Sequence, residues 1–310
     1  MDQAETIEPV MEQTEVITKT ESAKWQDGWV KHNGEVYAYK ENLMSFLIMG
    51  IDKTSITETD PEALDGGNAD VLMLFVMDPV KKHIDFIPIN RNTMVDVNVY
   101  DKEGDVLSSN LAQIAVQHGV GSGLEDSCEY EVRAVSNLFY QLPIHGYAAM
   151  TMDGIVPLCD AIGGVDVVVP EDYDAGSITF TKGETVHLED EEAYLFVRSR
   201  DTEVGGADRR LERQQVYLEA LIDKIYETIK NDPLSFMSIY NSVSDYTVTS
   251  ISGSKLIYLA TEAAGYEYDN DSVHEIPGAT TQGNVSDEFY VDDDKFRDMV
   301  IDIFYEKVDD

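Results

Sequence analysis

The arginines of this chain gather in one short stretch, "VRSRDTEVGGADRRLERQQ", which runs from Val197 to Gln215. Five of the eight arginines lie there, in a chain whose 60 Asp and Glu against 22 Lys and Arg give a formal net charge of −38. Guanidinium groups form paired hydrogen bonds with phosphate oxygens, so such a cluster suits a phosphate or pyrophosphate ligand. Surface salt bridges with the many carboxylates are the alternative, and composition alone leaves the two interpretations evenly balanced.

The spacing within the stretch predicts two arms that converge on one point. Arg210, Arg213 and Gln214 are three and four residues apart, which places them on neighbouring positions in the first turns of a helix. The start of a helix adds free N–H groups and a partial positive charge. Arg198 and Arg200 alternate with their neighbours, so at the end of a strand they share one side. A Gly-Gly loop joins the two arms, which together predict a pyrophosphate clamp.

Two carboxylates and a further arginine lie at the ends of predicted strands. Asp52 follows one apolar run, Asp70 begins the next, and Arg91 follows a third. Loops at strand ends form the ligand sites of α/β sheets, and Mg²⁺ prefers carboxylate oxygens that it shares with substrate phosphates. Each aspartate taken alone is better explained as an ordinary turn residue. The three residues together favour a metal ion and a guanidinium around a pyrophosphate.

Apolar patterning predicts the elements that must position these residues. Short continuous apolar runs indicate strands that are buried on both faces, and apolar residues at helical spacing indicate amphipathic helices. Strands interleaved with helices predict an α/β fold, a three-layer α/β/α domain with a central mixed β-sheet. The predicted strands are 43–52, 69–78 and 83–90, and the predicted helices are 110–119, 125–142 and 212–230, the last with Asp208 as its N-cap.

Two regions of different composition divide the chain. Residues 1–40 combine an acidic N-terminal linker with a short hairpin that turns at Asn33-Gly34. Residues 41–310 show no further boundary and are expected to form one domain. No apolar run reaches the roughly 18–20 residues that span a bilayer. The linker therefore fits either a segment that follows a missing membrane anchor or a plain cytosolic start.

The charge and the cysteines restrict the classes of function. A strongly acidic chain argues against nucleic acid as a partner and against broad adsorption to anionic lipid, because both need basic surface. An anionic ligand therefore needs a local basic site. Cys128 and Cys159 have no metal-ligand spacing, and they are consistent with either a disulfide or two buried free thiols.

Several ordered blocks of the sequence resemble the LytR-CpsA-Psr cell-wall glycopolymer transferases. "FLIMGID" is similar to the family's apolar strand that closes in Gly-x-Asp, and "NADVLMLFVMDP" to its Ser-Asp strand. "PINRNT" is similar to its Ser-x-Pro-Arg-Asp-Thr block, and "DGIVPLCDAIGGVDVVV" to its Gly-Gly-Val block. "KGETVHLEDEEAYLFVRSRD" and "DRRLERQQ" resemble its Val-Arg-x-Arg and Arg-x-x-Arg-Gln blocks. The order and separation of the blocks are more specific than any one of them.

The resemblance implies a membrane-anchored, extracytoplasmic bacterial domain and a Mg²⁺-dependent phosphotransferase. Such proteins move a teichoic acid, a capsular polysaccharide or another glycopolymer from an undecaprenyl-pyrophosphate carrier to peptidoglycan, forming a phosphodiester link, and one N-terminal helix holds them in the membrane. The polyprenyl tail lies in an apolar pocket between sheet and helices.

The family's site residues carry over to matching positions of this chain. The resemblance gives Mg²⁺ binding to Asp52 and Asp70, and it leaves Arg209 without a matching position. By sequence alone, Asp201 and Asp208 are the nearest candidates for a carboxylate that accepts the acceptor's proton. The implied pyrophosphate-binding residues are Arg91, Arg198, Arg200, Arg210, Arg213 and Gln214.

Departures from the family pattern leave other outcomes open. Asn90-Arg91-Asn92 stands where the family has Pro-Arg-Asp, and Thr54 stands where an Arg is usual. Loss of the carboxylate at residue 92 removes a group that orients Arg91 or accepts a proton. The alternatives are a hydrolase of the same polyprenyl pyrophosphate and a non-catalytic sensor of lipid-linked precursors. The sequence does not separate them.

Overall fold

The structure is a computed structural model that describes residues 28–60, 65–101, 103–199, 206–283 and 286–308. The chain forms two compact units, Glu41–Val300 and a smaller one that joins Met1–Lys40 to Ile301–Asp310. The boundary after Lys40 lies where the composition changes. The larger unit ends at Val300, whereas the predicted domain runs from 41 to 310. The difference arises because the last described strand pairs with the N-terminal hairpin.

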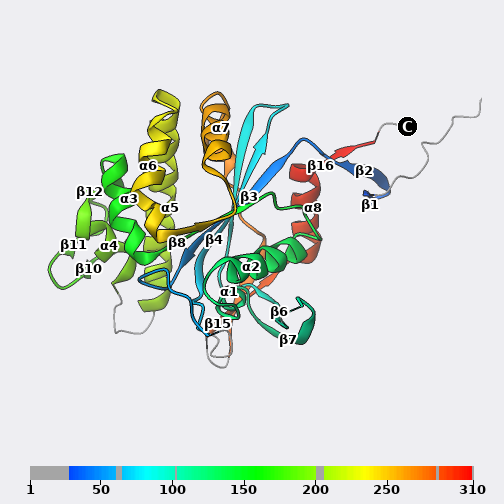
Figure 1. Ribbon diagram of the computed structural model, residues 1–310, viewed down its shortest axis with the longest axis horizontal. Helices are drawn as coiled ribbons and strands as arrows, with labels where there is room; N and C mark the ends of the chain where they lie inside the picture. The colour runs from blue at the N-terminus through cyan, green and yellow to red at the C-terminus, as the bar shows by residue number, and fades with distance from the viewer. Residues whose placement is uncertain (1–27, 61–64, 102, 200–205, 284–285, 309–310) are drawn as a thin grey trace, which may run out of the picture. The chain divides into compact units, whose positions relative to one another are not determined.

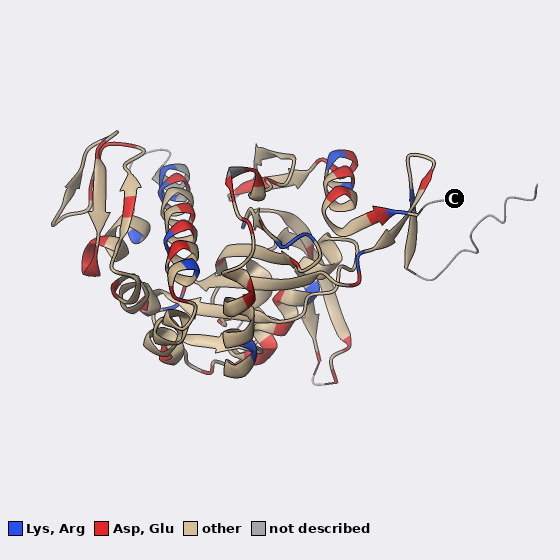
Figure 2. Ribbon diagram, turned by 90° about the horizontal axis from the view of Figure 1, so that it is seen from above, with Lys and Arg blue, Asp and Glu red and all other residues tan. Residues whose placement is uncertain are grey.

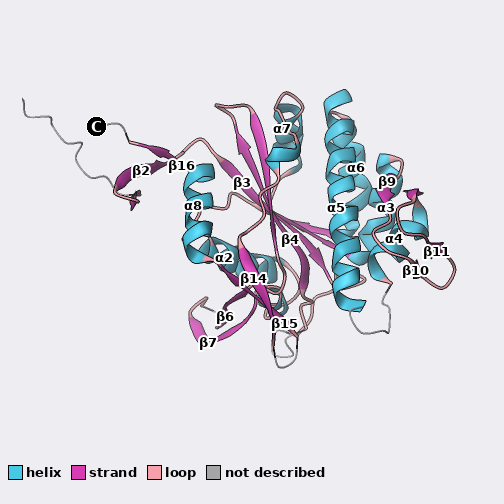
Figure 3. Ribbon diagram, turned by 180° about the vertical axis from the view of Figure 1, so that it is seen from behind, coloured by secondary structure: helices cyan, strands magenta, loops and turns pink. Residues whose placement is uncertain are grey.

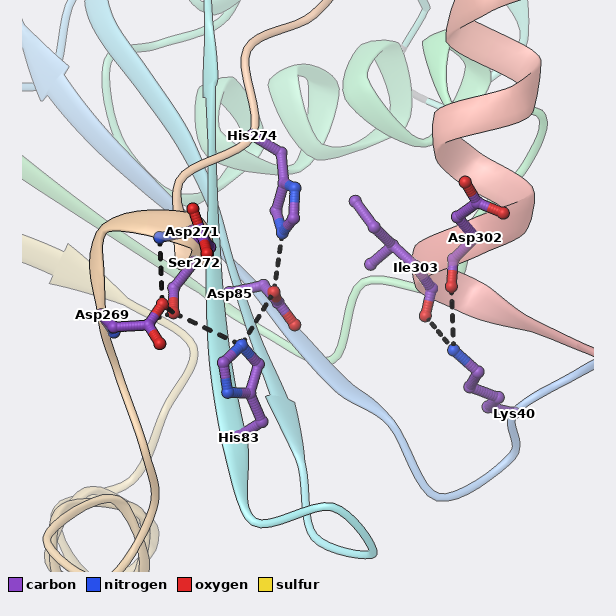
Figure 4. Close-up of polar contacts among 9 residues, drawn as sticks. All are labelled: Lys40, His83, Asp85, Asp269, Asp271, Ser272, His274, Asp302 and Ile303. Carbon is purple, nitrogen blue, oxygen red and sulfur yellow. Dashed lines mark hydrogen bonds and ion pairs between the residues drawn. The ribbon is translucent and has the colours of Figure 1, made fainter.

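The smaller unit contains a three-stranded antiparallel sheet in the order β1-β2-β16. Asn33 and Gly34 turn the hairpin with φ values of 50° and 88°, the left-handed pair that a tight type I′ turn requires. The Lys40 ammonium donates to the carbonyls of Asp302 and Ile303, which Figure 4 shows. The strands are β1 (Trp29–His32), β2 (Glu35–Tyr39) and β16 (Tyr305–Lys307).

The larger unit is built on a five-stranded mixed sheet in the order β13-β8-β3-β4-β5. The pairs β3–β4, β4–β5 and β13–β8 are antiparallel, and β3–β8 is parallel. The predicted strands are present, because their apolar residues are buried on both faces of the sheet. The strands are β3 (Met44–Ile51), β4 (Ala69–Asp78), β5 (His83–Ile89), β8 (Tyr147–Thr151) and β13 (Thr247–Thr249).

Helices cover both faces of this sheet, as Figures 1 and 3 show. On one side α1 (Val116–Gly119) and α2 (Glu125–Leu138) contact β4 and β8. On the other side α5 (Gly206–Asn231) and α7 (Gly253–Ala263) pack against an apolar cluster of the sheet that contains Phe46. This is the predicted three-layer arrangement. No helix in the described parts of the chain is long and apolar enough to cross a bilayer.

A second apolar cluster joins α3, α4, α5 and α6 to short strands beside the main sheet. α4 covers part of the stretch for which the alternation around Arg198 predicts a strand end. The helix forms because Ala193, Phe196 and Val197 recur at helical spacing and are buried in this cluster. The elements are α3 (Ile155–Ile162), β9 (Val165–Val168), β10 (Tyr173–Asp174), β11 (Thr179–Phe180), β12 (Thr185–Leu188), α4 (Asp190–Arg198) and α6 (Ser235–Val243).

Two hairpins and a last helix complete the chain. The predicted helix 110–119 is largely wrong, because residues up to Gln113 continue the second strand of a hairpin and only the last four are helical. The elements are β6 (Met94–Tyr100), β7 (Val106–Gln113), β14 (Gly278–Gln282), β15 (Asp287–Val291) and α8 (Asp293–Phe304), with short 3₁₀ turns η2 (Met152–Gly154), η3 (Ser244–Tyr246) and η4 (Asn270–Ser272).

A polar cluster fastens the segment after η4 to the edge strand β5 (Figure 4). The Asp85 carboxylate lies 2.7 Å from His274 Nε2 and 3.3 Å from His83 Nε2. Ser272 Oγ lies 3.3 Å from the same His83 nitrogen. These contacts cover an otherwise open sheet edge, which protects it from pairing with other chains.

Charge is spread unevenly over the molecule. Figure 2 shows acidic residues on helices, strands and loops throughout, with Lys and Arg much sparser, as the net charge of −38 requires. An anion therefore meets repulsion over most of the surface. Any site for an anionic ligand depends on the few guanidinium groups.

Candidate functional site

Three strand ends meet at one edge of the central sheet. β3 ends at Ile51 opposite Ala69, the first residue of β4, and β5 ends at Ile89 opposite Leu72. The two pairs are antiparallel, so the residues after β3, at the start of β4 and after β5 become neighbours. Asp52, Asp70 and Arg91 therefore come to the same edge, where the sequence places the ends of their strands.

A β-bulge sets the position of Asp70. Gly50 pairs with Val71 and Ile51 pairs with Ala69, so Asp70 is the extra residue between two regular pairs. Bulges redirect a side chain and are frequent next to active sites. A side chain at residue 50 would crowd the bulge, because a Cβ there would lie only 3.0 Å from the Val71 Cβ.

The Asp70 carboxylate lies between two guanidinium groups. Its Oδ1 is 2.8 Å from Arg91 Nη1, and its Oδ2 is 4.0 Å from Arg210 Nη2. The side chains of Asp70, Arg210 and Arg91 are only 10%, 14% and 20% exposed. Water screens these charges less than it would at the surface. Arg210 lies in the first turns of α5, so the structure brings together one predicted metal ligand and two predicted pyrophosphate ligands.

A tight turn holds Arg91 in place. Asn90 Oδ1 accepts a hydrogen bond from the Asn92 amide at 2.9 Å, and the Asn90 carbonyl accepts one from Thr93 Oγ1 at 2.6 Å. Asn92 Oδ1 accepts a third from Gln113 Nε2 at 2.9 Å. The asparagines that replace the family's Pro and Asp thus shape the loop themselves. This local network presents Arg91 at the sheet edge.

Buried donors at this edge have no partner within the described chain. The Nε of Arg91 and the Oγ1 of Thr151 are buried and make no hydrogen bond. Thr151 ends β8 and pairs with Ile51 in the parallel register, so it belongs to the same edge. An unsatisfied buried donor costs about 1–3 kcal/mol. An oxygen-rich ligand beside either group would satisfy it.

Arg213 has a different place from the one predicted. Its side chain is 0% exposed and forms an ion pair with Glu171. Its Nε donates to the Phe196 carbonyl at 3.2 Å, and its guanidinium lies 4.0 Å from the centre of the Tyr173 ring. Its donors are directed at protein groups and not at Asp70, so the structure lends no support to the prediction that Arg213 binds pyrophosphate, which stays a prediction. It fastens α5 to α4 and to the strands beside them.

The neighbours of Arg213 on α5 also contact the protein. Gln214 Nε2 donates to the Val197 carbonyl at 3.2 Å, so its amide holds the end of α4 instead of lying beside Asp70. Arg209 Nε lies 3.1 Å from Glu171, which therefore bridges two arginines. The salt-bridge interpretation of Arg209 is consistent with this pair. Of the predicted arm on α5, only Arg210 contacts Asp70 among the described ion pairs.

The other arm of the predicted clamp is only partly described. Arg198 lies in the last turn of α4, exposed, with its guanidinium 5.2 Å from the centre of the Tyr194 ring. It also donates to the Tyr194 hydroxyl, and no described contact joins it to Asp70. Arg200 and Asp201 lie outside the described residues, and so does the side chain of Asp208. The proposed proton acceptors stay predictions.

Among the described residues, the carboxylates at this edge are too few to hold a metal ion by themselves. They suit Mg²⁺, which takes part of its coordination shell from water and substrate. Asp52 is exposed, Asp70 is nearly buried, and no group of three or more His, Cys, Asp or Glu in the described residues is arranged to hold a metal ion. Mg²⁺ commonly binds one or two carboxylates and completes its shell with water and phosphate oxygens. Cys128 and Cys159 are buried free thiols, which settles the alternative of a disulfide.

Sequence reasoning missed Glu171 and Thr151. The residues before Thr151, "YAAM", are a short apolar strand signal, and pairing that strand in parallel with β3 would have brought Thr151 to the edge. Glu171 follows β9 in an acidic loop and carries no distinguishing signal. Only the fold shows that it meets Arg213, which lies 42 residues later.

Comparisons with known proteins point to one family. The model of the LytR_cpsA_psr family matches residues 8–301. The polyisoprenyl-teichoic acid–peptidoglycan teichoic acid transferase TagV of Bacillus subtilis (strain 168) is 32% identical over 198 residues, which are 62% of this chain and 46% of TagV. The corresponding TagU of Enterococcus faecalis (strain ATCC 700802 / V583) is 25% identical over 208 residues, 67% of this chain and 61% of TagU. The chain thus spans about half the length of these curated relatives.

Solved structures share the fold. The crystal structure of B. subtilis TagV has a TM-score of 0.61 and 26% identity, covering 85% of this chain and 97% of that one. A structure of TagT bound to LI-WTA has a TM-score of 0.59 and 18% identity, covering 84% and 89%, and shows a similar fold alone. The family model covers nearly the whole chain and the arrangement of the sheet agrees, so this protein belongs to the LytR_cpsA_psr family.

Proposed function

We propose that this chain transfers a teichoic acid or a related glycopolymer from a polyprenyl-pyrophosphate carrier to peptidoglycan. The observation that carries the proposal is the cluster at the sheet edge, in which Arg91 and Arg210 flank Asp70 and the Nε of Arg91 has no partner within the described chain. The names of TagV and TagU, as teichoic acid transferases that act on polyisoprenyl-linked substrates, support it.

The reaction exchanges one bond to phosphorus. The acceptor hydroxyl oxygen forms a bond to the phosphorus that carries the glycan, and the bond from that phosphorus to the bridging oxygen breaks. Polyprenyl phosphate leaves with the electron pair, and the hydroxyl proton passes to a base, for which Asp201 and Asp208 are our candidates. Arg91 and Arg210 stabilise the charge that develops on the leaving phosphate, which is the main requirement of phosphoryl transfer.

Magnesium is part of the proposal. Asp52 and Asp70 would hold Mg²⁺ through one carboxylate each, with pyrophosphate oxygens and water completing the shell. When bound, the ion neutralises pyrophosphate charge. The side chains of this chain orient the donor around it: Arg91 by its position after β5 and Arg210 by its position in the first turns of α5.

The cellular location of the chain is also part of the proposal. The family resemblance implies an extracytoplasmic domain tethered to the bacterial membrane, where both a lipid-linked donor and peptidoglycan are within reach. The strongly acidic surface gives the domain no broad attraction to anionic lipid, so a tether would have to hold it at the bilayer. The polyprenyl tail would keep the donor in the same bilayer.

The test is turnover of a purified lipid-linked donor. We expect the wild type to release polyprenyl phosphate in the presence of Mg²⁺ and to form a glycan–peptidoglycan product. Arg91→Ala should lose about 10–100-fold in turnover, because a charge-assisted contact is worth about 1.5–3 kcal/mol and the change removes the cation that lies 2.8 Å from Asp70. Lys230→Ala is the matched control, since Lys230 is a cation in the last turn of the same helix as Arg210.

Other outcomes separate the alternatives. Release of polyprenyl phosphate without any glycan–peptidoglycan product would identify a hydrolase. Binding of the donor without release would identify a sensor, for which the loss of the carboxylate at Asn92 is the motivating feature. If the chain binds no polyprenyl pyrophosphate, the result would contradict all three hypotheses, which are a transferase, a hydrolase and a sensor.

A further inference from the structure

A groove lies between the β6–β7 hairpin and the end of α2, separate from the Asp70 cluster. Its volume is about 670 Å³, within the range of sites that bind small ligands. Residues from both strands of the hairpin and from α2 and the turn after it line the groove. The polar part of the lining is Asp96, Asn98, Ser109, Asn137, Tyr140 and Gln141.

Much of this polar lining is not used by the protein itself. In the described part of the chain, the side chains of Asp96, Ser109, Asn137 and Gln141 are exposed and make no hydrogen bond with other protein groups. They offer a carboxylate, a hydroxyl and two amides, so the groove presents both donors and acceptors. A surface of this kind is suited to a ligand that is itself rich in hydroxyl and amide groups.

The backbone after α2 is held in an unusual conformation at the groove. Tyr140 and Gln141 have φ values of 57° and 67°, so two consecutive residues other than glycine lie in the left-handed region. The Gln141 amide donates to the Ser136 carbonyl at 2.7 Å, and the Tyr140 hydroxyl donates to Asp293 Oδ1 at 2.8 Å. Such strain persists where the surroundings fix it, and it is frequent at ligand sites. Here it presents both side chains to the groove.

The hairpin connects the groove to the proposed reaction site. β6 begins three residues after Arg91. Gln113, the last residue of β7, donates a hydrogen bond from its side-chain amide to Asn92 Oδ1. At roughly 3.3 Å per residue, Asp96 lies within about 17 Å of Arg91 along the chain. The groove therefore lies on the hairpin that continues the loop that carries Arg91.

We propose that this groove binds an uncharged glycan strand, the acceptor of the transfer reaction. This rests on the proposed function, which supplies the need for an acceptor. Amides, a carboxylate and a hydroxyl match sugar hydroxyl and acetamido groups, and Val95 and Leu138 offer apolar surface to the faces of the sugar rings. The net charge of −38 and the Asp96 carboxylate in the lining disfavour a polyanion.

The test measures glycan binding directly and without the donor. The probe is an uncharged hexamer of β-1,4-linked N-acetylglucosamine, titrated against the full chain and followed by nuclear magnetic resonance. The double variant Asn137→Ala, Gln141→Ala should bind it about tenfold more weakly, because it loses two hydrogen-bonding side chains. Asn241→Ala is the matched control, an exposed helical asparagine in α6, and should bind like the wild type.

The outcomes separate this inference from the proposed function. Equal binding by the wild type and the double variant, or no binding by the wild type, would overturn the proposal that this groove binds the glycan. Displacement of the hexamer by polyglutamate at physiological salt would also overturn it, since an acidic groove repels a polyanion. Binding of geranyl pyrophosphate in the presence of Mg²⁺ should be unchanged in the double variant, because the Asp70 cluster is intact. Absence of that binding in every variant and in the wild type would count against the proposed function alone.

Discussion

The pair between Arg213 and Glu171 gives the sharpest stability prediction. Arg213 is 0% exposed and Glu171 is 12% exposed, so Glu171→Ala leaves a buried guanidinium without its counter-charge. Breaking a buried ion pair from one side costs about 3–5 kcal/mol. That is a large fraction of the roughly 5–15 kcal/mol that stabilises a domain. We expect unfolding in urea to shift accordingly and the melting temperature to fall by about 10 °C.

Arg209→Ala is the control for this prediction. Arg209 pairs with the same carboxylate but is 30% exposed, so its loss should cost only about 0–1 kcal/mol. The assay is equilibrium urea unfolding of both variants, followed by circular dichroism. A Glu171→Ala variant as stable as the wild type would refute the structural role of this ion pair.

Three further predictions concern a buried acid, a buried hydroxyl and the metal. Burial raises the pKa of Glu131 well above 4.5, so the folded state keeps this proton where the unfolded chain loses it. Stability should therefore fall by up to about 1.4 kcal/mol per pH unit as pH rises above the unfolded pKa, and Glu131→Gln should flatten this slope in urea titrations from pH 5 to 8. Thr151→Val should leave stability unchanged or slightly higher, because the lost hydroxyl has no partner within the described chain. It should lower donor turnover about tenfold, because a bound donor loses one hydrogen bond. Equal turnover would remove Thr151 from the site. Chelation should abolish turnover and Mg²⁺ should restore it, with Asp52→Asn needing more Mg²⁺ for half-maximal rate; full turnover in a chelator would exclude a role for the ion.

The strands that position the site were predictable because of their burial. β3 and β4 are apolar on both faces, so their bounds follow from composition, and the positions of Asp52 and Asp70 at strand ends follow with them. The β-bulge at Asp70 was not predictable. It depends on the close contact of Gly50 with Val71 across two strands, which no local pattern encodes.

The Arg-rich stretch shows where sequence reasoning reached its limit. The alternation around Arg198 imitates a strand, but burial of Phe196 and Val197 at helical spacing makes the segment a helix. Arg210 and Arg213 look equivalent in sequence. One contacts Asp70 and the other is buried against Glu171, a difference set by a tertiary contact across 42 residues.

The measurement that tests the central claim most directly is binding of a short-chain polyprenyl pyrophosphate, such as geranyl pyrophosphate, by isothermal titration with Mg²⁺ present. The wild type should bind it, and Arg91→Ala and Arg210→Ala should each bind about 10–100-fold more weakly, because each loses a charge-assisted contact worth about 1.5–3 kcal/mol. Lys230→Ala should match the wild type. Equal affinity in all four proteins would contradict the assignment of the sheet edge as the pyrophosphate site.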